Sequence, residues 1–445
     1  MDWKEYYKSR TVSAKEAAQQ IQSNMVVCLA HATCVPESVL EAMADRHEEV
    51  KNVMLSHSLN YSGARLVTYP ESYHSNSMFS GPKFRGPINE GHGYVTPIHF
   101  TKIPQYQREL KPDFTLTICS PPDEHGYVNL GTSIDYGRNL VYAADKVIAE
   151  VNPNVPIVYG DAWVKVTDID YFVEVDTPMI AVKQGEPGEL EKIMAGHIAQ
   201  YIKDGDCLQL GIGGVPDAVL GFMNDKHDLG IHSEMISDGV MQLVKSGNIN
   251  CSRKSLHPNQ ITFTFAAGSQ EFYDWMDKNP MLLGLDVEYL NDPFIIAKND
   301  NMVSINGAVS VDLLGQVSAD SVAGKHWSGA GGQVDFVRGA IRSKGGRSFI
   351  ALPATAKGGA FSRIVAHLDP GQTITTSYYD VDHIVTEYGV AKLFGKSLSY
   401  RRDALIEIAA PQFRDQLREE SKQRHPYIKA DACKIRQHEE RKHLM

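Results

Sequence analysis

The sequence predicts an α/β protein made of two related domains, each built on a mainly parallel sheet. The first observation is length, because 445 residues exceed the roughly 250–300 residues at which a single core stops growing. The second is an internal repeat. The third is that apolar, strand-like runs alternate with helical patterns along the chain, and such alternation is typical of parallel sheets covered on both faces.

The repeat joins residues 35–47, VPESVLEAMADRH, with residues 215–227, VPDAVLGFMNDKH. Each copy follows a short apolar run, at residues 25–30 and at residues 207–210. Both copies therefore indicate a strand, a loop and then a helix with proline in its first turn. This shared order predicts that the two halves of the chain have the same core topology.

A second pair of similar segments, residues 144–150 and residues 381–387, is spaced farther apart than the first pair. This spacing implies an insertion in the second copy. The segment at residues 184–189 is short, polar and turn-rich, and an amphipathic helical pattern follows it. We therefore expect an N-terminal domain over residues 1–185 and a C-terminal domain over residues 186–445.

Composition excludes several classes of function. The 44 basic and 54 acidic residues give a formal charge of -10, which lacks the basic surplus of a nucleic-acid-binding protein. No run of about 18 apolar residues predicts a membrane span, and the charged first ten residues lack a signal sequence, so a cytoplasmic location is expected. The 6 cysteines form no CxxC pair and the 17 histidines no HExxH pattern, so we predict no metal site.

The loop at residues 211–217, GIGGVPD, lies between a predicted strand and a predicted helix. Backbone N–H groups in such a loop can converge on a phosphate or another anion. Pro216 stands where a dinucleotide-binding fingerprint has its third glycine. Glu234 nevertheless follows at about the distance of a ribose-binding acid, so dinucleotide binding and a plain turn both stay open.

The repeat also singles out Glu234. The first half has the sequence Ser-His-Ser-Leu ending at Leu59, and the second half has Ile-His-Ser-Glu ending at Glu234. A position that accepts leucine is apolar or enclosed, and a carboxylate there is costly unless it is paired or has a function. We therefore interpret Glu234 as a functional residue.

Four further segments could supply polar groups to a site. Residues 328–336, SGAGGQVDF, have glycines that let the backbone approach a ligand closely. Asn306 ends a buried-looking run, and Lys357 lies beside two glycines. Residues 90–94, EGHGY, place an acid, an imidazole and a phenol in one glycine-rich loop. A structural turn or cluster is an equally good interpretation of each segment alone.

Together the motifs indicate a family. GIGGVPDAV, HSEM, SINGAV, GAGGQVDF, ATAKGG, TEYGVAKL and SLSYRRDAL occur in this order, and EGHG and SPPDEHGYV precede them. The chain resembles, over nearly its whole length, the acetyl-CoA hydrolase/transferase family, and within it the 4-hydroxybutyrate CoA-transferase branch. The resemblance implies two CoA-transferase-type α/β domains with the active site at their interface, and a homodimer.

The resemblance also implies roles for residues. The family's glutamate, which becomes a glutamyl-CoA thioester, matches Glu234. Coenzyme A or acyl-CoA is then a substrate, with no permanently bound cofactor. The expected CoA contacts are Gly211, Ile212, Gly213, Gly214, Val215, Ser328, Gly332 and Lys357. The residues expected to line the pocket for the acid are His31, Glu90, His92 and Tyr94.

The implied reaction is chemically reasonable. Glutamate has a reference pKa near about 4.3, so an unperturbed Glu234 is an anion that can attack an acyl-CoA carbonyl. The N–H groups of Gly331 and Gly332, or the amide of Asn306, are candidate donors to the resulting oxyanion. The expected function is ping-pong transfer of CoA from 4-hydroxybutyryl-CoA or butyryl-CoA to a small carboxylate such as acetate. Acyl-CoA hydrolysis, itaconate or succinate CoA transfer, and non-catalytic acyl-CoA or sugar-phosphate binding remain alternatives.

Overall fold

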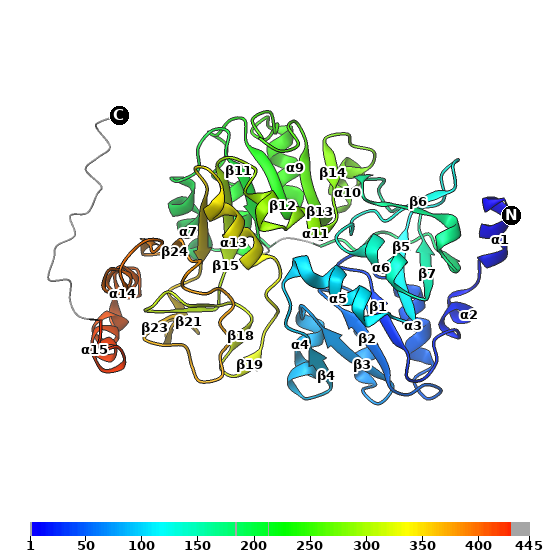
Figure 1. Ribbon diagram of the computed structural model, residues 1–445, viewed down its shortest axis with the longest axis horizontal. Coiled ribbons are helices and arrows are strands. Elements are labelled where there is room, and N and C mark those ends of the chain that lie inside the picture. The colour runs from blue at the N-terminus through cyan, green and yellow to red at the C-terminus, as the bar shows by residue number, and fades with distance from the viewer. Residues whose placement is uncertain (1, 183–184, 212, 429–445) are drawn as a thin grey trace.

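The computed structural model describes residues 2–182, 185–211 and 213–428. Two mainly parallel sheets lie side by side, one formed by the N-terminal half and one chiefly by the C-terminal half (Figure 1). Helices cover both sheets, so the predicted α/β class with mainly parallel sheets is confirmed. In the described part of the chain, no helix is both long and apolar enough to cross a membrane.

The N-terminal sheet has the strand order β10-β7-β5-β1-β2-β3-β4, and all its neighbours are parallel. Its strands are β1 (Val26–Leu29), β2 (Val53–His57), β3 (Tyr73–Ser77), β4 (Gly93–Val95), β5 (Phe114–Cys119), β7 (Lys146–Val151) and β10 (Tyr171–Glu174). A small antiparallel pair is formed by β6 (Tyr127–Asn129) and β9 (Trp163–Lys165). The helices of this half are α1 (Trp3–Arg10), α2 (Ala14–Ala18), α3 (Glu37–Asp45), α4 (Pro82–Asn89), α5 (Ile103–Leu110) and α6 (Gly137–Ala143), with the 3-10 turns η1 (Leu66–Thr68), η2 (Phe100–Lys102) and η3 (Val166–Asp168).

The C-terminal sheet has the order β25-β24-β20-β15-β11-β12-β13-β14-β8, and only β24 and β25 pair antiparallel within it. Its strands are β8 (Tyr159–Gly160), β11 (Cys207–Leu210), β12 (Gly230–Ile236), β13 (Ile261–Ala266), β14 (Leu282–Gly284), β15 (Met302–Gly307), β20 (Arg347–Ala351), β24 (His383–Thr386) and β25 (Gly389–Lys392). Strand β8 belongs by sequence to the N-terminal half, so the two halves share one sheet edge.

The helices of the C-terminal half are α7 (Glu189–Ala199), α8 (Gly214–Leu220), α9 (Asp238–Lys245), α10 (Gln270–Met276), α11 (Val287–Leu290), α12 (Pro293–Ile296), α13 (Gln333–Arg342), α14 (Leu398–Glu407) and α15 (Arg414–Arg424), with the 3-10 turn η4 (Pro411–Phe413). Short extra strands are β16 (Ser310–Asp312), β17 (Val317–Ser318), β18 (Ser321–Val322), β19 (Lys325–His326), β21 (Thr355–Ala356), β22 (Phe361–Ser362) and β23 (Ile364–Val365). These short strands follow β15 and β20 and form the additional parts of the longer half.

The sheet positions show how the repeat folds. Strand β1 lies between β5 and β2, as β11 lies between β15 and β12, and helices α3 and α8 follow the two equivalent strands. The second similarity is not equivalent in space, which corrects the sequence-based pairing. Strand β7 is the second neighbour of β1, and its counterpart beside β15 is β20 rather than β24. Buried strands of small and β-branched residues occur in many parallel sheets. The similarity between residues 144–150 and residues 381–387 therefore does not show that the two strands occupy equivalent positions.

The largest hydrophobic cluster crosses the boundary between the halves. It joins Ala30, Ile118 and Ile134 to the buried faces of β11, β12 and β13. The backbone N–H groups of Ile134 and Asp135 both donate to the carbonyl of Thr264 at 3.0 Å. The two sheets therefore pack as one body, and the loops at their meeting face are held in place by both halves.

Candidate active site

The site begins where three neighbouring parallel strands end. Strand β11 lies between β15 and β12, so Gly211, Asn306 and Glu234 come from adjacent strands. The backbone N–H of Gly211 donates to the carbonyl of Ile305 at 2.8 Å. The carboxyl ends of parallel strands are the usual place for a ligand in such folds, because the loops that follow them diverge there.

These strand ends open into a cavity of about 470 Å³ between the two halves. From the sequence-predicted set, the cavity is lined by Gly211, Glu234, Asn306, Ser328, Gly331 and Gly332. The N-terminal half contributes Leu59, Tyr61, Phe79 and Arg85 to the same wall. Leu59 and Glu234, the differing members of the repeat, thus face one cavity from opposite halves.

The carboxyl group of Glu234 is in contact with two other elements. The side-chain amide of Asn291 donates a hydrogen bond to Oε2 at 2.6 Å. The backbone of Gly332 lies against the same carboxyl, since a Cβ atom built there would be 1.9 Å from Oε2, and its N–H group lowers the pKa of Glu234. Asn291 directly follows α11, and Gly332 caps the N-terminus of α13. Two donors on separate elements therefore fix one carboxyl group from both sides, which is the arrangement that stabilises negative charge at a chosen oxygen.

Burial changes the acidity of Glu234. Removal of the carboxyl from water is the largest effect, and it raises the pKa to about 8. The buried carboxyls of Asp335 and Asp135 raise the pKa further, whereas the donors Asn291 and Gly332 lower it. The reference value used for the sequence-based mechanism does not hold here. Glu234 is mostly protonated at neutral pH in the unliganded protein.

Glycine is required at position 332 by close contacts. A Cβ atom there would lie 1.9 Å from Oε2 of Glu234 and 2.5 Å from Nδ2 of Asn291. Gly331 has a φ of 54°, in the left-handed region that favours glycine. The turn at residues 331–332 therefore brings backbone directly against the carboxyl of Glu234.

Asn306 differs from Gly332 as a possible donor. Its Nδ2 atom already donates to Ser304 Oγ at 2.9 Å and to Gln209 Oε1 at 3.1 Å, and its Oδ1 accepts from Gln209 at 3.3 Å. Both N–H bonds of the amide are thus engaged. In this arrangement Asn306 supports the wall of the cavity, and its amide has no N–H bond left for a ligand.

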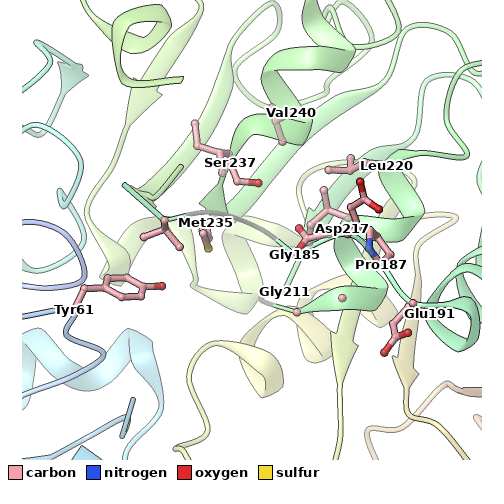
Figure 2. Close-up of a pocket in the computed structure, with 17 residues that line it drawn as sticks. Tyr61, Gly185, Pro187, Glu191, Gly211, Asp217, Leu220, Met235, Ser237 and Val240 are labelled. Carbon is pink, nitrogen blue, oxygen red and sulfur yellow. The ribbon is translucent and has the colours of Figure 1, made fainter. Parts of the chain in front are cut away.

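A second cavity of about 340 Å³ adjoins the first and shares Tyr61, Leu210, Gly211 and Met235 with it. Figure 2 shows Met235 between Tyr61 and the side where Asp217 and Glu191 lie. The loop residues Gly213 and Gly214 also line this cavity, and Gly213 has a φ of 135°. Burial raises the pKa of Asp217 to about 6. Carboxylates are therefore concentrated on this side of the loop, away from Glu234.

The other predicted site residues lie elsewhere. Ile212 is outside the described residues. Val215 packs into the main hydrophobic cluster. Lys357 is exposed beside the ring of Phe361. His31 is buried, and its Nδ1 contacts Asp135 Oδ2 at 2.7 Å.

The EGHGY loop is also separate from the cavity. It runs from the end of α4 into β4, at the outer edge of the N-terminal sheet. Glu90, His92 and Tyr94 are exposed, and Tyr94 retains 61% of its accessible surface. None of the three is among the residues that line the cavity within the described ranges. The single chain therefore does not bring this loop to Glu234.

Asn291 is the main residue that sequence reasoning missed. It follows α11 in the run Leu-Asn-Asp-Pro, where asparagine and aspartate read as ordinary turn and cap residues. Asn291 lies 57 residues after Glu234 in the sequence. Only the fold brings the two side chains together. Its Oδ1 atom is buried without a hydrogen-bond partner. The amide therefore donates to the carboxyl of Glu234 while its own acceptor oxygen is unsatisfied, which is unfavourable in free energy.

Two α/β halves that enclose a cavity with a carboxyl held in its wall are the arrangement expected of an enzyme that acts on a small acyl group. Comparison with known proteins identifies the family. Residues 1–183 match the acetyl-CoA hydrolase/transferase N-terminal domain, and residues 268–421 match the C-terminal domain of that family. The chain belongs to the acetyl-CoA hydrolase/transferase family, which confirms the resemblance found in the sequence.

Individual relatives are similar over almost their full length. The chain is 44% identical to a 4-hydroxybutyrate coenzyme A transferase of Clostridium kluyveri, over 95% of this chain and 100% of the relative. It is 37% identical to a butyryl-CoA:acetate CoA-transferase of Anaerostipes caccae, over 94% of this chain and 97% of the relative. A crystal structure of a 4-hydroxybutyrate CoA-transferase from Porphyromonas gingivalis matches with a TM-score of 0.80 and 38% identity, over 95% of this chain and 100% of that one.

Proposed function

We propose that this chain transfers CoA from a short-chain acyl-CoA, such as 4-hydroxybutyryl-CoA or butyryl-CoA, to a carboxylate such as acetate. One observation carries the proposal: the carboxyl of Glu234 lies in the cavity between the halves, accepts a hydrogen bond from Asn291 and lies against the backbone of Gly332. The names of the relatives from C. kluyveri and A. caccae support this choice of substrates. The reaction conserves the thioester, so its steps require no energy source beyond the acyl-CoA.

In the proposed first half-reaction, an ionised oxygen of Glu234 attacks the thioester carbonyl. The C–S bond breaks, CoA leaves as a thiolate, and an acyl-glutamyl anhydride forms. The thiolate then attacks the carbonyl carbon of Glu234, and the bond between that carbon and the bridging oxygen breaks, so the bridging oxygen leaves with the acyl group. This releases the first carboxylate and leaves a glutamyl-CoA thioester. A second carboxylate takes the CoA by the same steps in reverse, so no net proton is gained or lost.

The hydrogen bonds at Glu234 suit the second attack in that sequence. When the thiolate adds to the carbonyl carbon of Glu234, negative charge develops on the oxygen of that carboxyl. Asn291 Nδ2 already contacts Oε2 at 2.6 Å, and the backbone of Gly332 lies against the same group, close enough for its N–H to donate as charge develops. Donors placed in advance at the developing charge typically contribute about 10²–10³-fold to rate.

The pKa of Glu234 predicts a dependence of rate on pH. Only the ionised carboxyl is the nucleophile, and its pKa is about 8 in the free protein. We therefore expect kcat/KM for the acyl-CoA to rise about tenfold for each pH unit below 7 and to level off above about pH 8.5. The measurement is kcat/KM from pH 5.5 to 9.5 at constant ionic strength, with acetate, which stays ionised over this range, as acceptor. A flat profile between pH 6 and 9 would contradict the assigned pKa.

The test of transfer against hydrolysis follows CoA with and without an acceptor. With acetate present, a panel of acyl-CoA donors is expected to give acetyl-CoA, and double-reciprocal plots at several acetate concentrations are expected to be parallel. Without an acceptor, free CoA should appear at least about 100-fold more slowly, because a transferase must keep water from the thioester. Comparable release of CoA in both conditions would indicate a hydrolase. Binding of acyl-CoA without any turnover would indicate a binding protein.

The same panel separates the possible acids. If succinate or itaconate accepts CoA with a higher kcat/KM than acetate or butyrate does, the substrate assignment changes but the glutamate chemistry does not. Treatment with acyl-CoA and then borohydride should modify Glu234 alone, since the reductant attacks the thioester carbonyl. The modified residue is identified by peptide mass mapping. A modification at any other residue would show that this other residue, and not Glu234, is the nucleophile.

A further inference from the structure

One short segment of the N-terminal half touches both elements that supply donors to Glu234. Turn η2 packs against α11, which ends immediately before Asn291. The backbone N–H of Phe100 in η2 also donates to the carbonyl of Gly331 at 3.1 Å. The two donors at the carboxyl, Asn291 and Gly332, thus rest on the same turn, although both belong to the other half of the chain.

Thr101 makes the most enclosed of these contacts. Its hydroxyl lies 3.1 Å from each carboxyl oxygen of Asp335, and its backbone N–H lies 3.4 Å from Oδ2. Both side chains are buried, with 7% of Thr101 and 5% of Asp335 exposed. Asp335 lies in the first turn of α13, three residues after Gly332. A carboxyl buried to this degree needs a donor, so the Thr101 hydroxyl fixes where α13 begins.

We propose that Thr101 is a positioning residue for CoA transfer: by holding Asp335 beside the Phe100–Gly331 hydrogen bond, it fixes the turn at residues 331–332 against Glu234. The inference rests on the proposed function and deepens it, because it assigns to the N-terminal half a part in arranging the reacting carboxyl. Thr101 is not among the residues that line the cavity. It acts through Asp335 and the glycine turn, and it does not touch the substrate.

The contact also links Thr101 to the charge around Glu234. Asp335 from α13 and Asp135 from the loop before α6 both raise the pKa of Glu234. Asp335 in turn faces Lys102 from η2 and Arg338 from α13, which lower its own pKa, and Thr101 lowers it as well. Burial outweighs these effects and raises the pKa of Asp335 to about 7.

Loss of the hydroxyl therefore has a predictable electrostatic sign. Without the hydroxyl, Asp335 keeps only the backbone N–H of Thr101 as a donor from this residue, so its pKa is higher and it stays neutral to higher pH. A neutral Asp335 no longer repels the Glu234 carboxylate, so the pKa of Glu234 falls. The apparent pKa in the pH profile of kcat/KM should then move to lower pH, while the plateau rate falls because the glycine turn is less well fixed.

The experiment compares Thr101→Val with Thr101→Ser and with a matched control. Thr115→Val is the control, because Thr115 is also a buried threonine of the N-terminal sheet, and its hydroxyl donates to the carbonyl of Leu140 at 3.2 Å. For each protein we would measure the melting temperature, kcat and KM for CoA transfer, and the pH profile of kcat/KM. Wild-type transfer, measured first, tests the proposed function by itself.

We expect Thr101→Val to lower kcat by about 10–100-fold with KM for the acyl-CoA changed less than about threefold, since a loss of alignment near 1 Å has effects of this size. Thr101→Ser should restore kcat to within about threefold of wild type, and Thr115→Val should keep wild-type kcat despite a similar loss of stability. Thr101→Ala, paired with Thr115→Ala, replaces the valine variants if those do not fold. A kcat for Thr101→Val equal to that of its control, or a serine variant as slow as the valine variant, would overturn the inference.

Discussion

Glu234→Gln is expected to fold and to bind CoA but to lose transfer by at least about 10⁴-fold, because the amide has nearly the same shape and cannot act as the anionic nucleophile. The side chain can still accept the hydrogen bond that Asn291 now donates to Oε2 at 2.6 Å. The geometry of the cavity should therefore survive while the chemistry does not. Steady-state transfer to acetate, with CoA affinity from calorimetry, separates the two effects.

The same variant should be more stable than the wild type at neutral pH. Burial raises the pKa of Glu234 to about 8, so between about pH 4.5 and pH 8 the folded protein keeps a proton that the unfolded chain releases. Stability of the wild type therefore decreases as pH rises through this window. Glutamine does not titrate, so we expect Glu234→Gln to gain about 2–3 kcal/mol in the free energy of unfolding at pH 7, and nothing below pH 4.

Glu150→Gln provides the matched control for this prediction. Glu150 lies in β7 of the other sheet, is 3% exposed and accepts hydrogen bonds from Ser38. Burial raises its pKa too, so the stability effect should have the same sign without any loss of transfer. If purified Glu234→Gln kept more than a small fraction of the wild-type transfer activity, Glu234 could not be the nucleophile.

The sequence was sufficient to select Glu234 as a candidate, because the internal repeat provides a comparison within the chain. The repeat placed Leu59 and Glu234 at equivalent positions, and both indeed face the cavity between the halves. The glycine turn could also be predicted from the sequence, since three glycines in four positions before a helix allow backbone conformations and close approaches that other residue types do not. Local patterns of this kind survive in one sequence without any knowledge of the fold.

Properties that depend on distant residues were not predictable in the same way. The Asn291 contact joins two segments whose pairing is set by the order of β12, β13 and α11, and nothing in an Asn-Asp-Pro run indicates it. The acidity of Glu234 depends on burial and on Asp335 and Asp135, from two other segments. The EGHGY loop had suitable residue types, but its strand joins the outer edge of the sheet. Residue type indicates possible chemistry, and topology decides which groups meet.

Gly332→Ala is expected to lower kcat for transfer by about 10²–10³-fold. The added Cβ would lie 1.9 Å from Oε2 of Glu234 and 2.5 Å from Nδ2 of Asn291. Both groups must move by an ångström or more to reach normal contact distances. The hydrogen bond from Asn291 to Oε2 cannot then be kept, and the backbone N–H at position 332 moves away from the carboxyl, so the developing negative charge loses its donors.

The backbone itself should tolerate this substitution, which makes the variant a test of the site rather than of folding. Gly332 has φ -93° and ψ 8°, a conformation open to alanine, whereas Gly331 has a φ of 54°, in the left-handed region where alanine is uncommon. Gly86→Ala is the control, because a Cβ at Gly86 in α4 would meet nothing within 4 Å, and alanine there should favour the helix. We expect CoA affinity and melting temperature of Gly332→Ala near those of wild type, with the loss confined to kcat. Unchanged kcat in Gly332→Ala would mean that the carboxyl reacts in another position, and the donor roles of Asn291 and Gly332 would have to be abandoned together.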